Sequence, residues 1–138
     1  MKRFRVPIAA ALLGILAATA PAAMAKPRVI RLTSVLVSHH QSKTGSTDFD
    51  SDLIGSRVIG HDTVRCTGTS QATARCKVTF VRPSFGDLYL SFRPIFTSSS
   101  GHGIVTGGTR AYAGATGTFT YRNLNKSGSR SAVVVRLK

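Results

Sequence analysis

After Lys26, apolar and polar residues alternate along the chain, and no segment shows a sustained helical period. β-branched residues are frequent, and stretches rich in Gly, Ser, Pro and Asn separate the alternating segments at short intervals. Many short strands at such regular spacing favour an antiparallel β-barrel or a β-sandwich. The expected strands are 29 to 37, 48 to 54, 57 to 66, 74 to 82, 87 to 93, 103 to 106, 116 to 122 and 131 to 137.

Residues 1 to 25 have the three parts of a secretory signal peptide. The first five carry three positive charges, the next fifteen are almost wholly apolar, and small residues precede a cleavage position after Ala25. The apolar run is too short to span a bilayer, which needs about 20 apolar residues. We therefore expect a secreted protein, extracellular or periplasmic, without a transmembrane anchor, whose residues 26 to 138 form one domain.

The expected exported part is strongly basic. Three of the 19 Lys and Arg lie in the first five residues, which leaves 16 against five Asp, and the chain contains no Glu. A surface of this charge attracts anionic polymers, but the basic residues are spread singly along the chain rather than gathered in one run. This spacing favours a role in solubility, with binding of anionic polymers as the alternative.

Cys66 and Cys76 enclose nine residues rich in Thr, Ser, Gly and Ala. In an oxidising compartment such a pair is expected to form a disulfide at the base of a hairpin, where it would stabilise the fold by roughly 3 kcal/mol. The spacing is not that of a CxxC redox or metal motif, so we interpret the pair as structural. The four histidines lack metal-ligand spacing and no phosphate-binding glycine loop is present, so we expect no metal and no cofactor.

Successive strand residues point to opposite faces, so the alternation also predicts which side chains face the core. The predicted inward residues are Val58, Val64, Cys66, Cys76, Val78, Phe80, Leu88, Leu90, Phe92, Phe119, Tyr121, Val133, Val135 and Leu137.

Asp62 shares the predicted inward face of strand 57 to 66 with Val64. Arg82 extends the face of Phe80, and Tyr121 the face of Phe119, so both could reach the same interior. A buried carboxylate must be paired, hydrogen-bonded or protonated. We therefore hypothesise a mainly apolar cavity whose polar groups are Asp62, Arg82 and Tyr121. A bulge at Gly60 would instead turn Asp62 to the surface beside His61.

Residues 104 to 120, IVTGGTRAYAGATGTFT, resemble the GGTGxYxGAxG signature of the allene oxide cyclase-like and dirigent-like β-barrel proteins, including small secreted bacterial members. The Val58-Ile59-Gly60 segment before Cys66, and the turn from Pro83 into a strand after Cys76, are also similar to that family. The resemblance extends over residues 48 to 137. It implies an eight-stranded antiparallel barrel, and relatives of this barrel form trimers through strand contacts.

Two departures from the family pattern bear on function. Arg110 stands where the family usually has a glycine, so the turn there is expected to differ. Allene oxide cyclases are similar in fold and use a carboxylate in an apolar pocket, but a cyclase-type glutamate is absent here because the chain has no Glu. Dirigent proteins steer coupling with cavity Asp and Arg groups, and that role could fall only on an Asp such as Asp62.

The glycines of the motif have a structural interpretation that needs no function. Gly107 and Gly108 can adopt positive φ or allow close strand approach, and Gly114 and Gly117 suit a turn and a bulge.

Three functional hypotheses follow. The first is binding of a small, largely apolar molecule in the interior. The second is an isomerase or coupling-guide activity that uses Asp62. The third is binding of anionic polymers through the basic exterior, which raised salt would weaken.

Overall fold

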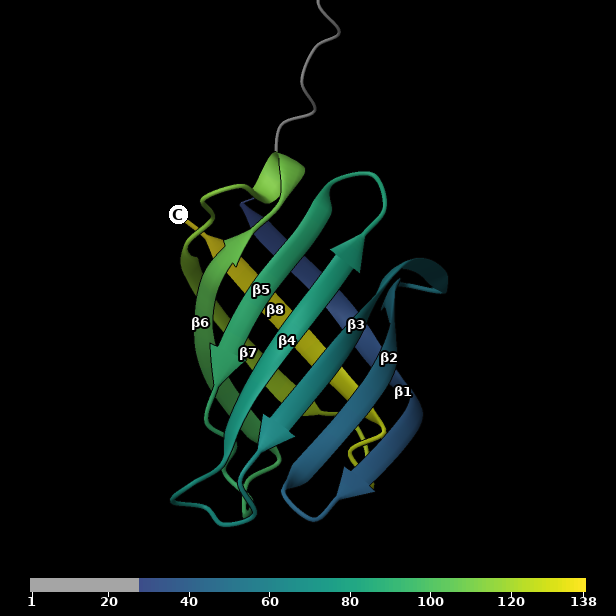
Figure 1. Ribbon diagram of the computed structural model, residues 1–138. Helices are drawn as coiled ribbons and strands as arrows, with labels where there is room; N and C mark the ends of the chain where they lie inside the picture. Colours follow the sequence, from purple (N-terminus) through teal and green to yellow (C-terminus); the bar gives the residue numbers. More distant parts are fainter. Residues whose placement is uncertain (1–27) are drawn as a thin grey trace, which may run out of the picture.

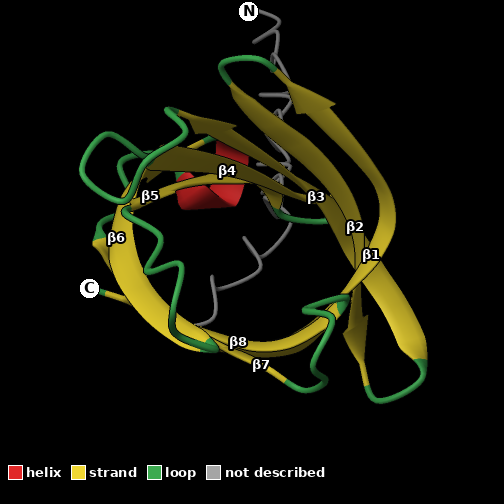
Figure 2. Cartoon of the chain, turned by 90° about the horizontal axis from the view of Figure 1, so that it is seen from below, coloured by secondary structure: helices red, strands yellow, loops and turns green. Residues whose placement is uncertain are grey.

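The computed structural model describes residues 28–138 as eight antiparallel strands that close into a barrel in chain order, from β1 next to β2 round to β8 next to β1 (Figure 1). Figure 2 looks along the barrel and shows the strands forming a ring. The strands are β1 (Val29–Ser42), β2 (Gly45–Ile54), β3 (Arg57–Thr67), β4 (Arg75–Arg82), β5 (Gly86–Phe92), β6 (Ser100–Gly108), β7 (Gly117–Asn123) and β8 (Arg130–Leu137).

The predicted fold class is confirmed, and each expected strand overlaps one observed strand. β1 and β6 run further than expected, and a short 3-10 helix, η1 (Arg110–Tyr112), precedes β7. The predicted signal peptide, residues 1 to 25, lies outside the described residues. Within residues 28–138, no helix has the length and apolar character needed to cross a membrane.

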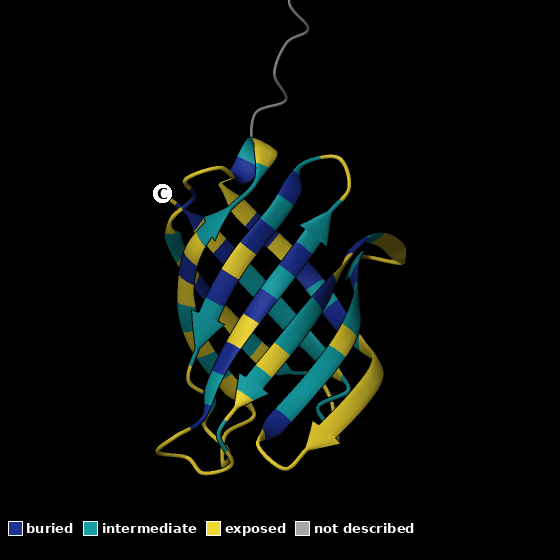
Figure 3. Ribbon diagram, viewed as in Figure 1, coloured by how far each residue is buried: buried dark blue, intermediate teal, exposed yellow. Residues whose placement is uncertain are grey.

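Most side chains that point into the barrel belong to the strand faces that alternation predicted to be inward. Figure 3 shows buried and exposed positions alternating along the front strands. The cores of β4, β5, β7 and β8 supply Phe80, Leu88, Phe119 and Val135, each at most 3% exposed. Phe92, Tyr121 and Val133 pack against these residues, so the predicted inward faces of the four strands are confirmed.

The prediction for Val58 is wrong. Asp52 pairs with Gly60 and Leu53 pairs with Val58, so Ile59 is an extra residue in β3, a bulge. The bulge turns Val58 outward, where it is 61% exposed, and lets Ile59 pack against the core. Because the extra residue precedes Gly60, the faces of Asp62 and Val64 are unchanged.

The glycine motif forms the turn that closes one end of the barrel. Gly117 has φ 150°, and a Cβ there would collide with the carbonyl oxygen of Arg136 on β8. Arg110 adopts φ 51°, a conformation that glycine favours, and its Nη1 donates to the Pro83 carbonyl oxygen at 3.0 Å. The backbone of this turn therefore keeps a glycine-like conformation despite the arginine.

Candidate functional site

A cavity of about 260 Å³ lies inside the barrel. Its lining includes Pro94 and Gly128, which belong to the loops at the end where Cys66 and Cys76 lie. At the opposite end η1 covers the barrel with Tyr112, which is fully buried (Figure 1). The cavity is therefore approached from the disulfide end.

Four carboxyl groups line this cavity, although the chain has only five acidic residues. Asp48, Asp50 and Asp52 are spaced by two along β2, so all three face inward, and Asp62 on β3 lies opposite Asp50. Exposure falls along β2 with depth, from 32% for the Asp48 side chain to 0% for Asp52. The carboxyls thus form a column that runs from the mouth into the interior.

One hydroxyl serves two of these carboxyls. Ser34 Oγ on β1 lies 3.1 Å from Asp50 Oδ2 and 3.4 Å from Asp62 Oδ2. A serine hydroxyl has a single hydrogen, so it donates to one carboxylate at a time. Asp50 Oδ1, Asp62 Oδ1 and both oxygens of Asp52 are buried without a hydrogen-bond donor. The column is therefore undersupplied with donors.

The shortage of donors and the crowding of like charges change how these groups hold protons. Burial is the main cause that raises the pKa of Asp52 to about 9, and the negative charge of Asp62 raises it further. Burial also raises the pKa of Asp62 to about 6, helped by the charge of Asp50 and opposed by the hydrogen bond from Ser34. The pKa of Asp50 is raised by burial as well. At neutral pH Asp52 therefore holds its proton, whereas Asp62 is mostly ionised and takes up a proton as the pH falls towards 6.

The rest of the cavity wall is aromatic and aliphatic. Phe92 contacts Phe119 with ring centroids 5.7 Å apart and Tyr121 at 5.4 Å, both edge to face. β7 carries Tyr121 and is four strands from β3 in the ring, so Tyr121 lies across the barrel from Asp62. The site therefore has an acidic wall facing an aromatic one.

Of the three predicted polar groups, the structure brings Asp62 and Tyr121 to one cavity and places Arg82 elsewhere. Arg82 is the last residue of β4, at the closed end, where its Nη1 donates to Tyr112 Oη at 2.9 Å. Its guanidinium lies 4.4 Å from the ring centroid of Phe85. Arg82 does lie on the same face of β4 as Phe80, as predicted. It is too far along the strand to reach the cavity, however, and is not part of the cavity lining.

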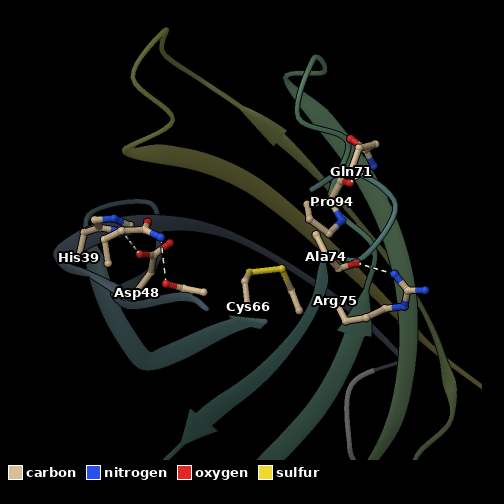
Figure 4. The surroundings of a disulfide bond; sticks show 10 residues. His39, Asp48, Cys66, Gln71, Ala74, Arg75 and Pro94 are labelled. Carbon is tan, nitrogen blue, oxygen red and sulfur yellow. Dashed lines mark hydrogen bonds and ion pairs between the residues drawn. A yellow bond between two sulfur atoms is a disulfide. The ribbon is translucent and has the colours of Figure 1, made fainter. Parts of the chain in front are cut away.

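The mouth of the cavity is held by covalent and polar links. Cys66 and Cys76 are directly opposed on β3 and β4 and form a disulfide that lines the cavity, as predicted (Figure 4). Gln71, in the loop that the disulfide closes, donates to the Pro94 carbonyl oxygen at 2.6 Å. On the other side of the mouth, His39 Nδ1 is hydrogen-bonded to Asp48 Oδ1 (Figure 4). These links join β3 to β4, the loop between β3 and β4 to the loop between β5 and β6, and β1 to β2.

Sequence reasoning missed Asp48, Asp50, Asp52 and Ser34. The signal was present, because the three aspartates share one face of the expected strand 48 to 54. A face with three carboxyls is not expected inside a barrel, because charged residues are almost never buried without partners. The acidic wall of the site could therefore be recognised only from the pairing of β2 with β1 and β3.

The fold and the cavity define a closed eight-stranded barrel with an internal pocket of small-molecule size. No protein-family model matches the chain, and no curated protein sequence matches it. Among solved structures, pyocyanin demethylase is similar over 80% of this chain and 99% of its own, with a TM-score of 0.62 and 18% identity. A pterocarpan synthase dirigent protein is similar over 80% of this chain and 84% of its own, with a TM-score of 0.54 and 14% identity. The chain thus has the barrel fold of the allene oxide cyclase-like and dirigent-like proteins, as its glycine motif implied.

Proposed function

We propose that this chain is an exported barrel that binds a small, largely apolar molecule in its interior. The observation that carries the proposal is a cavity of about 260 Å³ with an aromatic and aliphatic wall, open at one end of the barrel. This volume is slightly smaller than the usual range for small-molecule sites, which begins at roughly 300 Å³. The size fits a molecule of one or two rings.

Export is supported by the sequence of residues 1 to 25 and by the disulfide, since disulfides persist in oxidising compartments. Two barrels of the same fold are named for small organic molecules, pyocyanin and a pterocarpan. Both names support an interior that accepts a small molecule.

Binding of a small molecule in the interior can be tested with a substitution on β8 that makes the cavity smaller. Val133 lines the cavity, whereas its neighbour Val134 does not. We expect 2-phenylethanol to shift backbone amide signals of cavity residues in an NMR titration of the wild type and of Val134→Phe. Val133→Phe should weaken binding at least about tenfold, because the added ring occupies the space of the ligand. Equal binding by the two variants, or no shifts in the wild type, would contradict an interior site.

A second candidate function is acid–base steering of a reaction by Asp62. The observation that favours it is the pKa of Asp62, raised to about 6 mainly by burial, beside a carboxyl that stays protonated at neutral pH. A group of this pKa can both accept and donate a proton near neutrality. If a molecule carried through purification is identified by native mass spectrometry, its turnover should rise or fall around pH 6 and be lost in Asp62→Asn. Turnover that is unchanged in Asp62→Asn would exclude this role.

Binding of anionic polymers through the exterior stays a prediction from charge alone. It can be distinguished by its salt dependence, because the affinity for an anionic polymer falls steeply as salt is raised, whereas the affinity of an apolar cavity does not. A heparin column eluted with a salt gradient measures it.

A further inference from the structure

The charges of this protein are separated between its inside and its outside. Four of its five carboxyls line the cavity, and the fifth, Asp87, lies outside it. Over residues 28–138, the cavity lining includes no Lys, Arg or His. A chain with a formal charge of +14 therefore encloses a pocket in which the charged side chains are all carboxylates.

The deepest carboxyls of the pocket lack counterparts. Asp52 is fully buried and neither of its oxygens has a donor, while Asp62 is 7% exposed and its Oδ1 has none. Buried polar groups without partners are rare in native proteins, because each costs the free energy of its lost hydration. Such groups, aimed into a cavity, indicate a ligand that brings hydrogen-bond donors.

The aromatic wall of the cavity indicates which kind of hydrogen-bond donor the ligand carries. In the described part of the chain, no group of three or more His, Cys, Asp or Glu is arranged to hold a metal ion. The wall across the cavity instead carries the aromatic rings of Phe119 and Tyr121, which favour an apolar body and attract a cation to their ring faces. Aromatic rings opposite carboxylates are the environment that organic ammonium groups find favourable.

We infer that the interior pocket selects a small organic cation, a protonated amine on an aromatic or aliphatic body, with the nitrogen bound by Asp62 and Asp50 and the body against Phe119 and Tyr121. This inference rests on the proposed function and specifies the class of ligand. The ammonium donates the hydrogen bonds that Asp50 Oδ1 and Asp62 Oδ1 lack, and its positive charge offsets the charge of the carboxylates.

Binding of a cation must be coupled to loss of a proton. The groups that face Asp62 are Ser34 from β1, Asp50 and Asp52 from β2, the phenyl ring of Phe80 from β4 and the phenol of Tyr121 across the barrel. A bound positive charge favours ionised carboxyls and lowers their pKa values. Affinity should therefore rise from pH 5 to pH 8, through the pKa of Asp62 near 6, while an alkylamine stays protonated to about pH 10.

The test compares 2-phenylethylamine with 2-phenylethanol, which differ in charge and little in shape. At pH 8 the amine should bind the protein at least about tenfold more tightly than the alcohol, as expected for a charge-assisted hydrogen bond. Calorimetry at pH 6, in two buffers of different ionisation heat, should show release of about half a proton per amine, because Asp62 is then about half protonated, and none for the alcohol.

Asp62→Asn keeps the shape of the side chain and should reduce the preference for the amine to less than about threefold. Asp87→Asn, the same change outside the cavity, should leave the preference intact. If the alcohol binds as tightly as the amine at pH 8, or if Asp62→Asn retains the preference, the cation inference is wrong while interior binding stands. If neither probe binds, both the inference and the proposed function fail.

Discussion

Asp62 on β3 lies directly opposite Asp50 on β2, with both carboxyls facing the cavity. Like charges at directly opposed positions of an antiparallel pair destabilise a sheet. A hydrophobic pair at these positions would give a more stable barrel. The two carboxyls therefore indicate a functional site and do not serve the packing of the core.

The stability of the protein should depend on the acidic column. A carboxyl whose pKa is raised on folding holds its proton longer in the folded state, so the free energy of unfolding falls as pH rises from about 4 towards the folded pKa. Asp52, with a pKa of about 9, contributes this loss throughout that range. Asp52→Asn removes it and should stabilise the protein at pH 8.5 by at least about 1 kcal/mol.

Urea unfolding at pH 4.5 and pH 8.5 measures this effect, and the acid condition is the internal control. At pH 4.5 the wild-type carboxyl is protonated when folded, and this pH lies less than one unit above the ordinary pKa of 3.8 that the carboxyl has when unfolded, so the variant should gain much less than at pH 8.5. A gain of equal size at both pH values would show that Asp52 is not held protonated by its surroundings.

The disulfide should account for a large part of the stability. Removing the link between Cys66 and Cys76, which are ten residues apart, frees a closed loop of the unfolded chain and should cost about 3 kcal/mol. The double variant Cys66→Ala/Cys76→Ala should unfold at a temperature lower by about 10 to 20 °C in a thermal scan. Reduction of the wild type with dithiothreitol should produce a similar loss, and a loss below about 1 kcal/mol would contradict the prediction.

Two glycines of the motif should respond very differently to an added methyl group. Both have positive φ, but a Cβ on Gly117 would collide with the Arg136 carbonyl, whereas one on Gly114 would meet nothing within 4 Å. We expect Gly114→Ala to cost about 1 kcal/mol of backbone strain and Gly117→Ala at least about 3 kcal/mol, because β7 and β8 must move apart. Chemical denaturation of the two variants measures the difference, and similar costs would argue against close approach of the strands at Gly117.

The bulge at Ile59 can be tested by polar substitution of adjacent residues. Val58→Asn should change the free energy of unfolding by less than about 1 kcal/mol, because the side chain is exposed. Ile59→Asn should cost about 2 to 4 kcal/mol, because it puts an amide against the core. The reverse order would mean that β3 has no bulge there.

Much of the fold could be predicted from the sequence because its signals are local. Alternation located all eight strands, and it placed Phe80, Leu88 and Val135 inside correctly. The pairing of Cys66 with Cys76 was equally accessible, since a short polar loop between two strands brings their bases together. Side-chain direction within a strand depends only on the backbone period of two.

The site was predicted in part. Asp62 was expected to face the interior and does so, but Arg82 lies at the closed end, and Asp50 and Asp52 were missed. Alternation predicts whether a side chain points inward, but it does not predict how deep in the barrel that side chain lies, because the inward residues are distributed along the whole length of the barrel.

The sequence by itself therefore determined the strands, the inward faces of β4, β5, β7 and β8, and the disulfide, each of which depends on residues close together in the chain. Only the tertiary structure decided that Ile59 bulges, that Arg82 lies beyond the cavity, and that Asp50 and Asp62 meet opposite Ser34. These relationships depend on the register between strands that close a ring. The register is set by the packing of all eight strands at once, and no single segment encodes it.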